Sequence, residues 1–242
     1  MKFQTIHISE TDSTNRWLRE RNVFEGDGAE PDMVVVADFQ TAGRGCGTNS
    51  WESERGSNLL FSILLHPKGV KANQQFLISE IIALALAETI AKRVGEGVSI
   101  KWPNDIYWHD RKLCGILIEH RLSGNTIAES IIGVGLNVNQ SVFVSNAPNP
   151  VSLKQITGLE TDRMELLEEV MAQVVQGTQG MQGVHQRFLE WLYRREGFHR
   201  YSDKDGEFEA SLSTVRPDGT LVLTDRTGRQ REYAFKEVQY II

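Results

Sequence analysis

Two segments of the chain, residues 98–102 and 113–119, have the length and β-branched content of buried strands. The residues between them are mostly polar and include an Asp-Arg-Lys run. Globular folds seldom place so much charge between strands without a use for it. Pro103 cannot donate a hydrogen bond to a sheet ladder, so we expect Asn104 and Asp105 to turn out of the sheet. The fold must therefore contain a sheet with polar side chains at the ends of its strands.

The remaining apolar periodicity predicts helices packed on this sheet. Capping side chains at Asp12-Ser-Thr-Asn15 predict a first helix, and Asp162 is the expected N-cap of a later one. The longest helical pattern spans residues 75–93. Glu80 and Glu88 interrupt it at a cost inside a bilayer, so we predict a buried helix and no membrane span. Further strands are expected at 33–39, 58–65 and 127–134, and a further helix at 181–195.

The chain changes character after Gly197. Short alternating segments are separated there by turn pairs such as Asp205-Gly206 and Thr227-Gly228, which predicts a small all-β module. We therefore expect a domain boundary near residue 196, with one domain over 1–196 and a second over 197–242. Because the first domain combines strands and helices, the predicted fold class is α+β.

Charge and cysteine content exclude several classes of protein. The formal net charge is −6 without a basic run, so the stripe typical of a nucleic-acid-binding protein is missing. Residues 1–15 contain no apolar core of a secretory signal. Two cysteines, Cys46 and Cys114, are too few for a disulfide framework or a four-ligand zinc site. We expect a protein of the reducing cytoplasm that binds neither nucleic acid nor membrane.

A glycine-rich segment, Gln40-Thr-Ala-Gly-Arg-Gly-Cys-Gly-Thr-Asn-Ser-Trp51, follows the strand at 33–39. Its glycines allow backbone N–H groups to converge on an anion, and Arg44 adds a guanidinium that can bind two oxygens. Taken alone, the segment is better interpreted as a surface hairpin with an exposed Arg44, because short Gly/Arg motifs are common by chance. It matches neither a Walker A loop nor a dinucleotide fingerprint, because the glycine spacing differs and no Gly-Lys-Ser/Thr follows.

Several polar residues admit both a binding and a structural interpretation. Trp51 could stack on a base or pack in the core. Lys112 directly precedes an apolar strand, which places its ammonium at a strand mouth, although a lone lysine is usually a solvated charge. Asn104 and Asp105 could orient phosphates or a magnesium ion, or simply form a turn. Together with the glycine-rich segment, these residues suggest a site for a phosphate ester beside an acyl group.

Four motifs occur in one order along the chain, and in order and spacing they resemble those of the biotin protein ligases, the biotin–[acetyl-CoA-carboxylase] ligases. They are Asp12-Ser-Thr-Asn15, Gln40-Thr-Ala-Gly-Arg-Gly45 with Trp51, Lys101-Trp-Pro-Asn-Asp105 with Arg111-Lys-Leu-Cys-Gly115, and Gly133-Val-Gly-Leu-Asn137. The resemblance covers nearly the whole chain. It implies a mixed β-sheet catalytic domain packed with helices, the class II synthetase-like biotin/lipoate ligase fold, followed by a small SH3-like β-barrel.

The resemblance also implies substrates and residue roles. Biotin and ATP with Mg²⁺ are the expected substrates, biotinyl-5′-AMP the intermediate, and a biotin carrier domain of a carboxylase the protein partner. Arg44 and Lys112 are the expected catalytic cations, and Asp105 is the expected contact to Mg²⁺. Biotin contacts are expected from Ser13, Thr14, Asn15, Gln40, Gly43, Arg44, Gly45, Lys112 and Gly115. Contacts to ATP and the adenylate are expected from Cys46, Trp51, Asn104, Asp105 and Asn137.

The chain departs from the family pattern in its glycine-rich segment. Many relatives continue it as Gly-Arg-Gly-Arg/Gln-Arg-Gly, whereas this chain has Cys46, Gly47 and Thr48, so a cation near the intermediate is missing. We predict looser retention of biotinyl-AMP than in arginine-bearing relatives. About a dozen residues precede Ser13, fewer than a helix-turn-helix module needs, so we expect the monofunctional type without an N-terminal DNA-binding domain.

Two other functions remain as alternatives. A lipoate ligase or octanoyltransferase would share the catalytic architecture, although the Ser-Thr-Asn and Gln-Thr-Ala-Gly-Arg-Gly runs favour biotin. A catalytically weak biotin-binding sensor would act through protein contacts, which Arg44 and Lys112 make less favourable. An exposed sheet edge could also support a homodimer.

Overall fold

A computed structural model describes residues 3–21, 32–47, 49–144 and 148–242. One group of strands comprises β1 (Gln4–Ile8), β2 (Met33–Ala37), β3 (Leu59–Leu65), β4 (Val98–Lys101), β5 (Asp105–Trp108), β6 (Arg111–Ser123) and β7 (Thr126–Leu136). A second comprises β8 (His199–Asp203), β9 (Gly206–Val215), β10 (Leu221–Asp225), β11 (Gln230–Tyr233) and β12 (Gln239–Tyr240). The helices are α1 (Thr14–Arg21), α2 (Phe76–Val94), α3 (Leu153–Thr157), α4 (Arg163–Gln179) and α5 (Val184–Glu190).

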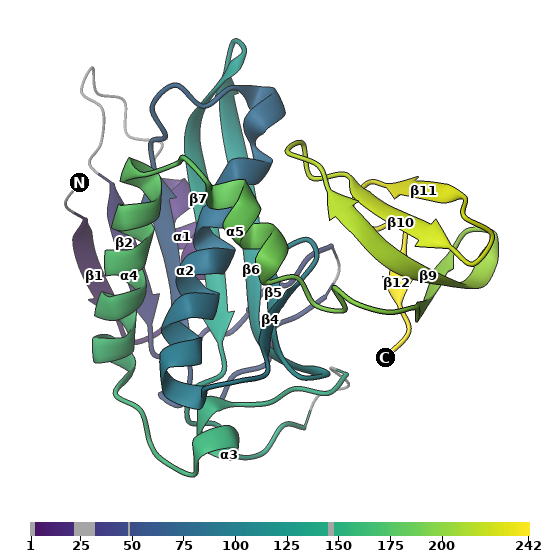
Figure 1. Cartoon of the computed structure of the whole chain (residues 1–242). Helices are drawn as coiled ribbons and strands as arrows, with labels where there is room; N and C mark the ends of the chain where they lie inside the picture. Colours follow the sequence, from purple (N-terminus) through teal and green to yellow (C-terminus); the bar gives the residue numbers. More distant parts are fainter. Residues whose placement is uncertain (1–2, 22–31, 48, 145–147) are drawn as a thin grey trace.

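The described strands form two sheets (Figure 1). The larger has seven strands in the order β1-β2-β3-β7-β6-β5-β4, and the smaller has five in the order β11-β10-β9-β8-β12. β1 and β2 are parallel while the other neighbours in the large sheet are antiparallel, so that sheet is mixed. The predicted combination of a mixed sheet with helices and a C-terminal β module is confirmed, and the small antiparallel sheet is compatible with an SH3-like domain.

Helices cover both faces of the large sheet. In Figure 1, α2, α4 and α5 lie in front of the sheet, and α1 lies behind it. β3, an interior strand, is buried along its whole length because its alternate residues face the two helical layers. Phe61 and Ile63 join the core that contains α2 and α4, whereas Leu64 packs with Leu18 of α1. The site described below lies on the α1 face.

The predicted buried helix is α2. It ends at Val94, and the next residue, Gly95, has a φ of +73°, as a residue after a helix often does. By length and composition the stretch Ala72–Val94 could cross a membrane, but 67% of its most apolar window is buried inside the protein. Glu80 of this helix is buried, which raises the pKa of its carboxyl, and its Oε1 lies 2.5 Å from Nδ1 of His185 on α5. The residue that interrupts the apolar pattern therefore joins two helices.

The expectation that Asp105 turns out of the sheet was wrong. Asp105 begins β5 and pairs with Lys101, so residues 102–104 form the turn of a β4–β5 hairpin. Pro103 lies in that turn, where no ladder hydrogen bond is required of it. The hairpin returns the Asp105 carboxylate to the sheet beside β6. The strand β5 was therefore not predicted, and neither were β1 and α3.

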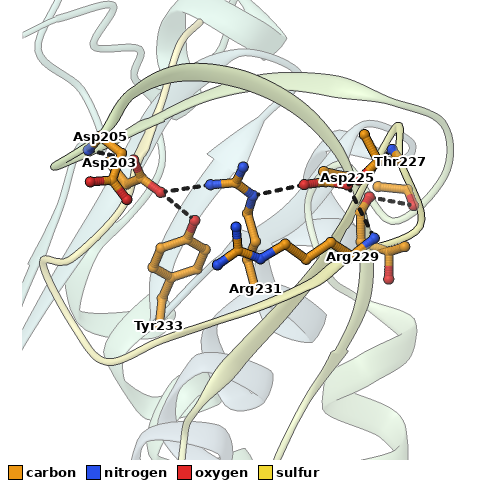
Figure 2. Close-up of polar contacts among 9 residues, drawn as sticks. Asp203, Asp205, Asp225, Thr227, Arg229, Arg231 and Tyr233 are labelled. Atoms are coloured by element: carbon orange, nitrogen blue, oxygen red, sulfur yellow. Dashed lines mark hydrogen bonds and ion pairs between the residues drawn. The ribbon is translucent and has the colours of Figure 1, made fainter.

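A polar network fixes the turns of the small sheet (Figure 2). Arg231 donates through Nε to Asp225 at 3.0 Å and through its terminal nitrogen to Asp203 at 3.2 Å. The Tyr233 hydroxyl donates to Asp203 at 2.6 Å, and Thr227 donates to Asp225 through its hydroxyl at 2.6 Å. Arg231 and Tyr233 both lie on β11. The network therefore fixes the strand that leads into the turn at residues 234–237.

The small sheet contacts the β4–β5 hairpin. Nε1 of Trp102, in the hairpin turn, donates to the Gly219 carbonyl at 2.9 Å. The Trp102 ring also meets Phe235 edge-on, with ring centroids 6.2 Å apart. Buried residues of both sheets belong to one continuous hydrophobic cluster. The division into domains at residue 196 stays a prediction.

Candidate functional site

The centre of the α1 face is lined by glycines. Gly133 and Gly135 are two residues apart on β7 and share one face, and Gly115 on β6 pairs directly with Gly135. A Cβ at Gly133 or Gly135 would come closer than 3.0 Å to a side chain above it, and one at Gly115 would lie 2.8 Å from the Trp51 ring. We call these three residues the glycine floor. Only glycine permits so close an approach to the sheet backbone at these positions.

Four side chains form a polar cluster above one end of the floor: Thr14, Asn15, Gln40 and Ser62. The N–H and hydroxyl of Thr14 both donate to Gln40 Oε1, at 2.7 and 3.0 Å. The Ser62 hydroxyl lies 2.7 Å from Thr14 Oγ1 and 2.6 Å from Asn15 Oδ1, and its single proton can serve only one of them at a time. Such a set of hydroxyl and amide groups can satisfy a neutral ring that carries both donors and an acceptor.

The Asn15 side chain is held by two strands and a helix. Its Oδ1 lies above Gly133, and its Nδ2 donates to Glu119 Oε2 on β6 at 3.0 Å. Glu119 is in turn paired with Arg19 of α1, with a nitrogen-to-oxygen distance of 2.5 Å. Ser13, also predicted as a contact, is buried directly before the helix. The orientation of the Asn15 amide is thereby fixed by a charged pair behind it.

A β-bulge brings Lys112 to the same face as the glycine floor. The pairing of β5 with β6 shifts by one residue at Leu113, which is left as an extra residue. In an uninterrupted strand, Lys112 and Gly115 would face opposite sides of the sheet. With the bulge, Lys112 Nζ lies 3.3 Å from the position that a Cβ on Gly115 would take. The ammonium therefore stands at the edge of the floor.

Lys112 and Trp51 close the other end of the floor. Nζ of Lys112 lies 2.6 Å from Asp105 Oδ2 and 5.8 Å from the centroid of the Trp51 ring. The indole lies above Gly115 and Gly135, and its Nε1 is buried without a hydrogen-bond partner among the described residues. A buried N–H without an acceptor is uncommon in folded proteins. It offers a donor to an oxygen brought by a ligand.

The glycine-rich segment forms a hairpin beside Trp51. The backbone N–H of Trp51 donates to the Gly43 carbonyl at 2.9 Å, and the backbone N–H of Gly45 donates to the Asn49 carbonyl at 2.7 Å. Gly43 is buried, and a Cβ there would lie 2.8 Å from the Trp51 carbonyl oxygen. The Arg44 side chain is exposed and has no ion pair with any described residue. The predicted surface hairpin with an exposed Arg44 is thus confirmed, and the binding of an anion by this segment stays a prediction.

The remaining predicted contacts differ in their surroundings. Cys46 and Asn104 are half-buried, the first after Gly45 and the second in the β4–β5 turn. Asn137 is buried, and its Nδ2 donates to the Val151 carbonyl at 3.0 Å. Its Oδ1 has no partner among the described residues. Asn137 thus keeps one unused acceptor.

A second lysine of the motif, Lys101, lies against the C-terminal module. Its Nζ is 4.7 Å from the centroid of the Tyr240 ring and 5.4 Å from that of Tyr107. Burial among these rings lowers the pKa of the Lys101 ammonium. Of the two lysines that frame the motif, only Lys112 borders the glycine floor.

A magnesium ion would find one carboxylate at this site. Among the described residues, no group of three or more His, Cys, Asp or Glu side chains could hold a metal. Asp105 is a single carboxylate already paired with Lys112. Mg²⁺ that accompanies a nucleotide takes most of its ligands from phosphates and water. One carboxylate is enough for such an ion but too few for a metal held by protein ligands alone.

Sequence analysis missed two residues that shape the site. Ser62 is the one polar residue of β3, and it is fully buried. A single serine within the apolar run Leu-Leu-Phe-Ser-Ile-Leu-Leu is a sequence signal that could have identified it. Glu119 ends an apolar segment and gave no comparable signal. Gly133 and Gly135 were identified as part of a family motif, but the sequence did not place them opposite Asn15 and Trp51.

Comparison with known proteins identifies the family. The model of the biotin/lipoate A/B protein ligase family matches residues 8–137, more than half of the chain. A biotin–[acetyl-CoA-carboxylase] ligase of Paracoccus denitrificans is 30% identical over 167 residues, which cover 66% of this chain and 67% of that protein. The chain belongs to the biotin/lipoate A/B protein ligase family. The matched segment contains the polar cluster, the glycine floor and Lys112.

Other relatives are longer than this chain. The bifunctional ligase/repressor BirA of Bacillus subtilis is 32% identical over 169 residues, 68% of this chain and 49% of that protein. The chain thus spans about half the length of the curated Bacillus relatives that it matches. The structure of biotin protein ligase from Aquifex aeolicus in complex with biotin and ATP has a TM-score of 0.78 at 26% identity. That similarity covers 98% of this chain and 99% of the other, so it includes the C-terminal module.

Proposed function

We propose that the protein activates biotin with ATP and transfers it to a lysine of a biotin carrier domain. The observation that carries this proposal is the position of two unlike groups on one face of the sheet. The polar cluster stands above Gly133, and the Lys112 ammonium stands beside Gly115. The Aquifex relative whose structure matches 98% of this chain was solved with biotin and ATP.

In this proposal the substrates lie along the glycine floor. The ureido ring of biotin would bind the polar cluster, where Ser62 and Thr14 supply hydroxyl groups and Asn15 an amide. The aliphatic tail would then cross the floor, where the missing side chains leave room for it. The carboxylate at the end of that tail would meet Lys112, and the adenylate would pack by Trp51.

The first reaction joins two anions. A carboxylate oxygen of biotin attacks the α-phosphorus of ATP, the bond to the bridging oxygen breaks, and pyrophosphate leaves with biotinyl-5′-AMP formed. The main obstacle is charge repulsion at phosphorus, which fixed cations reduce. Lys112 and Arg44 would supply those cations. Mg²⁺ bound with the nucleotide would add a further positive charge, held on the protein side by Asp105.

The second reaction needs no nucleophile from this chain. The neutral ε-amine of a carrier lysine attacks the acyl carbon of biotinyl-5′-AMP, AMP leaves with the bonding electrons, and the amine loses a proton. Because the intermediate is a mixed anhydride, exclusion of water protects it until the carrier arrives. Cys114 is unsuited to a covalent role, since complete burial raises the pKa of its thiol far above neutrality.

The setting of the enzyme follows from the same proposal. Its partners would be a carboxylase carrier domain and the two small molecules, in the cytoplasm, without nucleic acid or membrane. The expected homodimer stays a prediction, as does the division into domains at residue 196.

Incubation with biotin, Mg-ATP and a biotin carrier domain tests the proposal. We expect the mass of the carrier to rise by one biotinyl group, and we expect a carrier with its target lysine changed to arginine to stay unmodified. The matched incubation with lipoate separates the second branch of the family. Modification by lipoate in place of biotin would contradict the proposal.

A further inference from the structure

A lysine of the C-terminal module reaches the glycine-rich hairpin. Gly47 has a φ of +73°, and a Cβ at that position would lie 2.9 Å from Nζ of Lys236. The Lys236 ammonium therefore lies against the hairpin backbone directly after Cys46. Gly47 and Lys236 are distant in sequence, so the fold creates this contact and no sequence motif predicts it.

The backbone at Lys236 has a conformation that lysine rarely adopts. Its φ is +73°, in the left-handed region that favours glycine. The turn at 234–237 holds it there, since Glu237 N–H donates to the Ala234 carbonyl at 3.2 Å and Ala234 N–H donates to Glu237 Oε2 at 2.7 Å. Phe235 anchors the turn against Trp102. Backbone strain at such a site motivates a functional hypothesis for the side chain.

The Lys236 ammonium is not paired with any described carboxylate. Among the described residues no carboxylate lies within ion-pair distance of its Nζ, and its nearest recorded aromatic contact is the Phe235 ring, with the centroid 5.7 Å away. Arg44 in the same hairpin is likewise unpaired with described residues. The hairpin thus carries Arg44 and is contacted by Lys236, and neither cation is paired with a described carboxylate. Guanidinium and ammonium groups of this kind can donate charge-assisted hydrogen bonds to phosphate oxygens.

We infer that Lys236 binds a phosphate group of the nucleotide and replaces the cation that the hairpin lacks at Cys46. This inference rests on the proposed function, because it assigns a residue to the adenylate end of the same site. It also gives the C-terminal module a chemical task, since the module completes the cation set of the catalytic sheet. The predicted loose retention of biotinyl-AMP is thereby revised: retention depends on Lys236.

The variant Lys236→Gly gives the sharpest test. Glycine accepts the positive φ, so the variant removes the ammonium and relieves the strained backbone at once. We expect the KM for ATP in biotin-dependent pyrophosphate exchange to rise about tenfold, as for one lost charge-assisted contact at a partly solvated site. The thermal midpoint of unfolding should stay equal or rise. Because activity and stability move in opposite directions, misfolding cannot explain the result.

A matched control and a rescue complete the design. Lys204→Gly removes the same charge from an exposed turn of the same module and should leave the KM for ATP unchanged. Cys46→Arg in the Lys236→Gly background restores a cation from the hairpin side and should recover most of the affinity. The rate at which biotinyl-AMP leaves the enzyme should rise in Lys236→Gly and fall again in the double variant.

The outcomes separate this inference from the proposed function. Exchange by the wild type together with an unchanged KM for ATP in Lys236→Gly overturns the inference alone. A raised KM for the carrier domain with unchanged ATP kinetics also overturns it, because Lys236 would then be a docking residue. Absence of exchange in the wild type overturns the proposed function. In that case calorimetry with Mg-ATP decides on Lys236, and equal affinity in both proteins defeats the inference.

Discussion

Nζ of Lys112 and Oδ2 of Asp105 are 2.6 Å apart, on neighbouring strands of the large sheet. The pair exists because the β4–β5 hairpin returns Asp105 to the sheet and the bulge at Leu113 brings Lys112 to the floor side. In this arrangement the cation proposed to meet the reacting phosphate is already balanced by a carboxylate. A phosphate that binds there competes with Asp105 for the Lys112 ammonium. Lys112 should therefore stabilise the transition state, where the negative charge at phosphorus is greatest, more than it stabilises the bound substrate.

Lys112→Met should separate catalysis from stability. We expect biotin-dependent pyrophosphate exchange to slow by a factor of about 10² to 10³, as when one preorganised donor is removed from a transition state. The thermal midpoint should change little, because a pair whose side chains are 29% and 25% exposed contributes at most about 1 kcal/mol. Lys154→Met, which breaks the surface pair with Glu160, is the control and should leave exchange intact. An unchanged kcat for Lys112→Met would remove the residue from the mechanism.

Gly133→Ala should damage the biotin end of the site. Its Cβ would collide with Asn15 Oδ1, so either the amide or the strand must shift. We expect a cost of about 1–3 kcal/mol in unfolding free energy, typical of overpacking, and a higher KM for biotin with little change in the KM for ATP. Gly180→Ala is the matched control, because φ there is −118° and the nearest atom is 3.4 Å from the new Cβ. A rise confined to the KM for ATP would contradict the assignment of this end to biotin.

Ser62 should act as a positioning residue for Thr14 and Asn15. Ser62→Ala deletes a fully buried hydroxyl that lies within hydrogen-bond distance of both side chains. We therefore expect a stability loss of about 1 kcal/mol and a rise in the KM for biotin with kcat nearly retained. Steady-state kinetics with biotin as the varied substrate measures this. Thr89→Val removes a buried hydroxyl that has no partner among described residues, from the helix α2, and should leave the KM for biotin unchanged. Equal effects of both variants would reduce Ser62 to a structural role.

Elements with local signals were predictable from the sequence. Asp162 caps α4 through hydrogen bonds to the N–H groups of Met164 and Glu165, as its position before the helix predicted. The bounds of β3 and α2 follow their apolar periodicity within about two residues. These patterns depend on the residue and its near neighbours, so a single sequence contains them.

Features that depend on a partner strand were not predictable. The one-residue shift at Leu113 arises from the pairing of β5 with β6, and the return of Asp105 arises from the β4–β5 hairpin. Lys236 contacts Gly47 only because the small sheet packs on the β4–β5 hairpin of the large sheet. The strand register and the packing of the C-terminal module depend on segments that are distant in the chain. No local sequence pattern therefore predicts them.

Trp51 should report on binding through its fluorescence. Its indole covers Gly115 and Gly135 and has an unused N–H, so a ligand on the floor must change its surroundings. We expect emission to change when biotin and Mg-ATP are added, and we expect most of this change to vanish in Trp51→Phe. The same variant should raise the KM for ATP about tenfold, in the range of one stacking contact. Trp191→Phe, at the end of α5, is the control. Retention of the full signal in Trp51→Phe would contradict the placement of ligands on the glycine floor.

Acid should weaken the C-terminal module through Asp225. Hydrogen bonds from Thr227, together with those from Arg231 and the Arg229 N–H, lower the pKa of Asp225 from its ordinary 3.8 to about 2. A carboxyl whose pKa is lower in the folded state stabilises the fold above pH 3.8 and loses that contribution as pH falls towards about 2. The difference in unfolding free energy between wild type and Asp225→Asn should therefore be largest near neutrality and shrink below pH 4, measured by urea unfolding at several pH values.

Asp205→Asn is the control for this prediction, because Asp205 contributes only its backbone N–H to the network through Asp203. Its difference from wild type should not depend on pH in the same interval. Because Arg231 and Tyr233 precede the turn that carries Lys236, Asp225→Asn should also raise the KM for ATP at neutral pH, where the module is still folded. A pH-dependent stability difference without any change in the KM for ATP would show that the network stabilises the module but does not position Lys236.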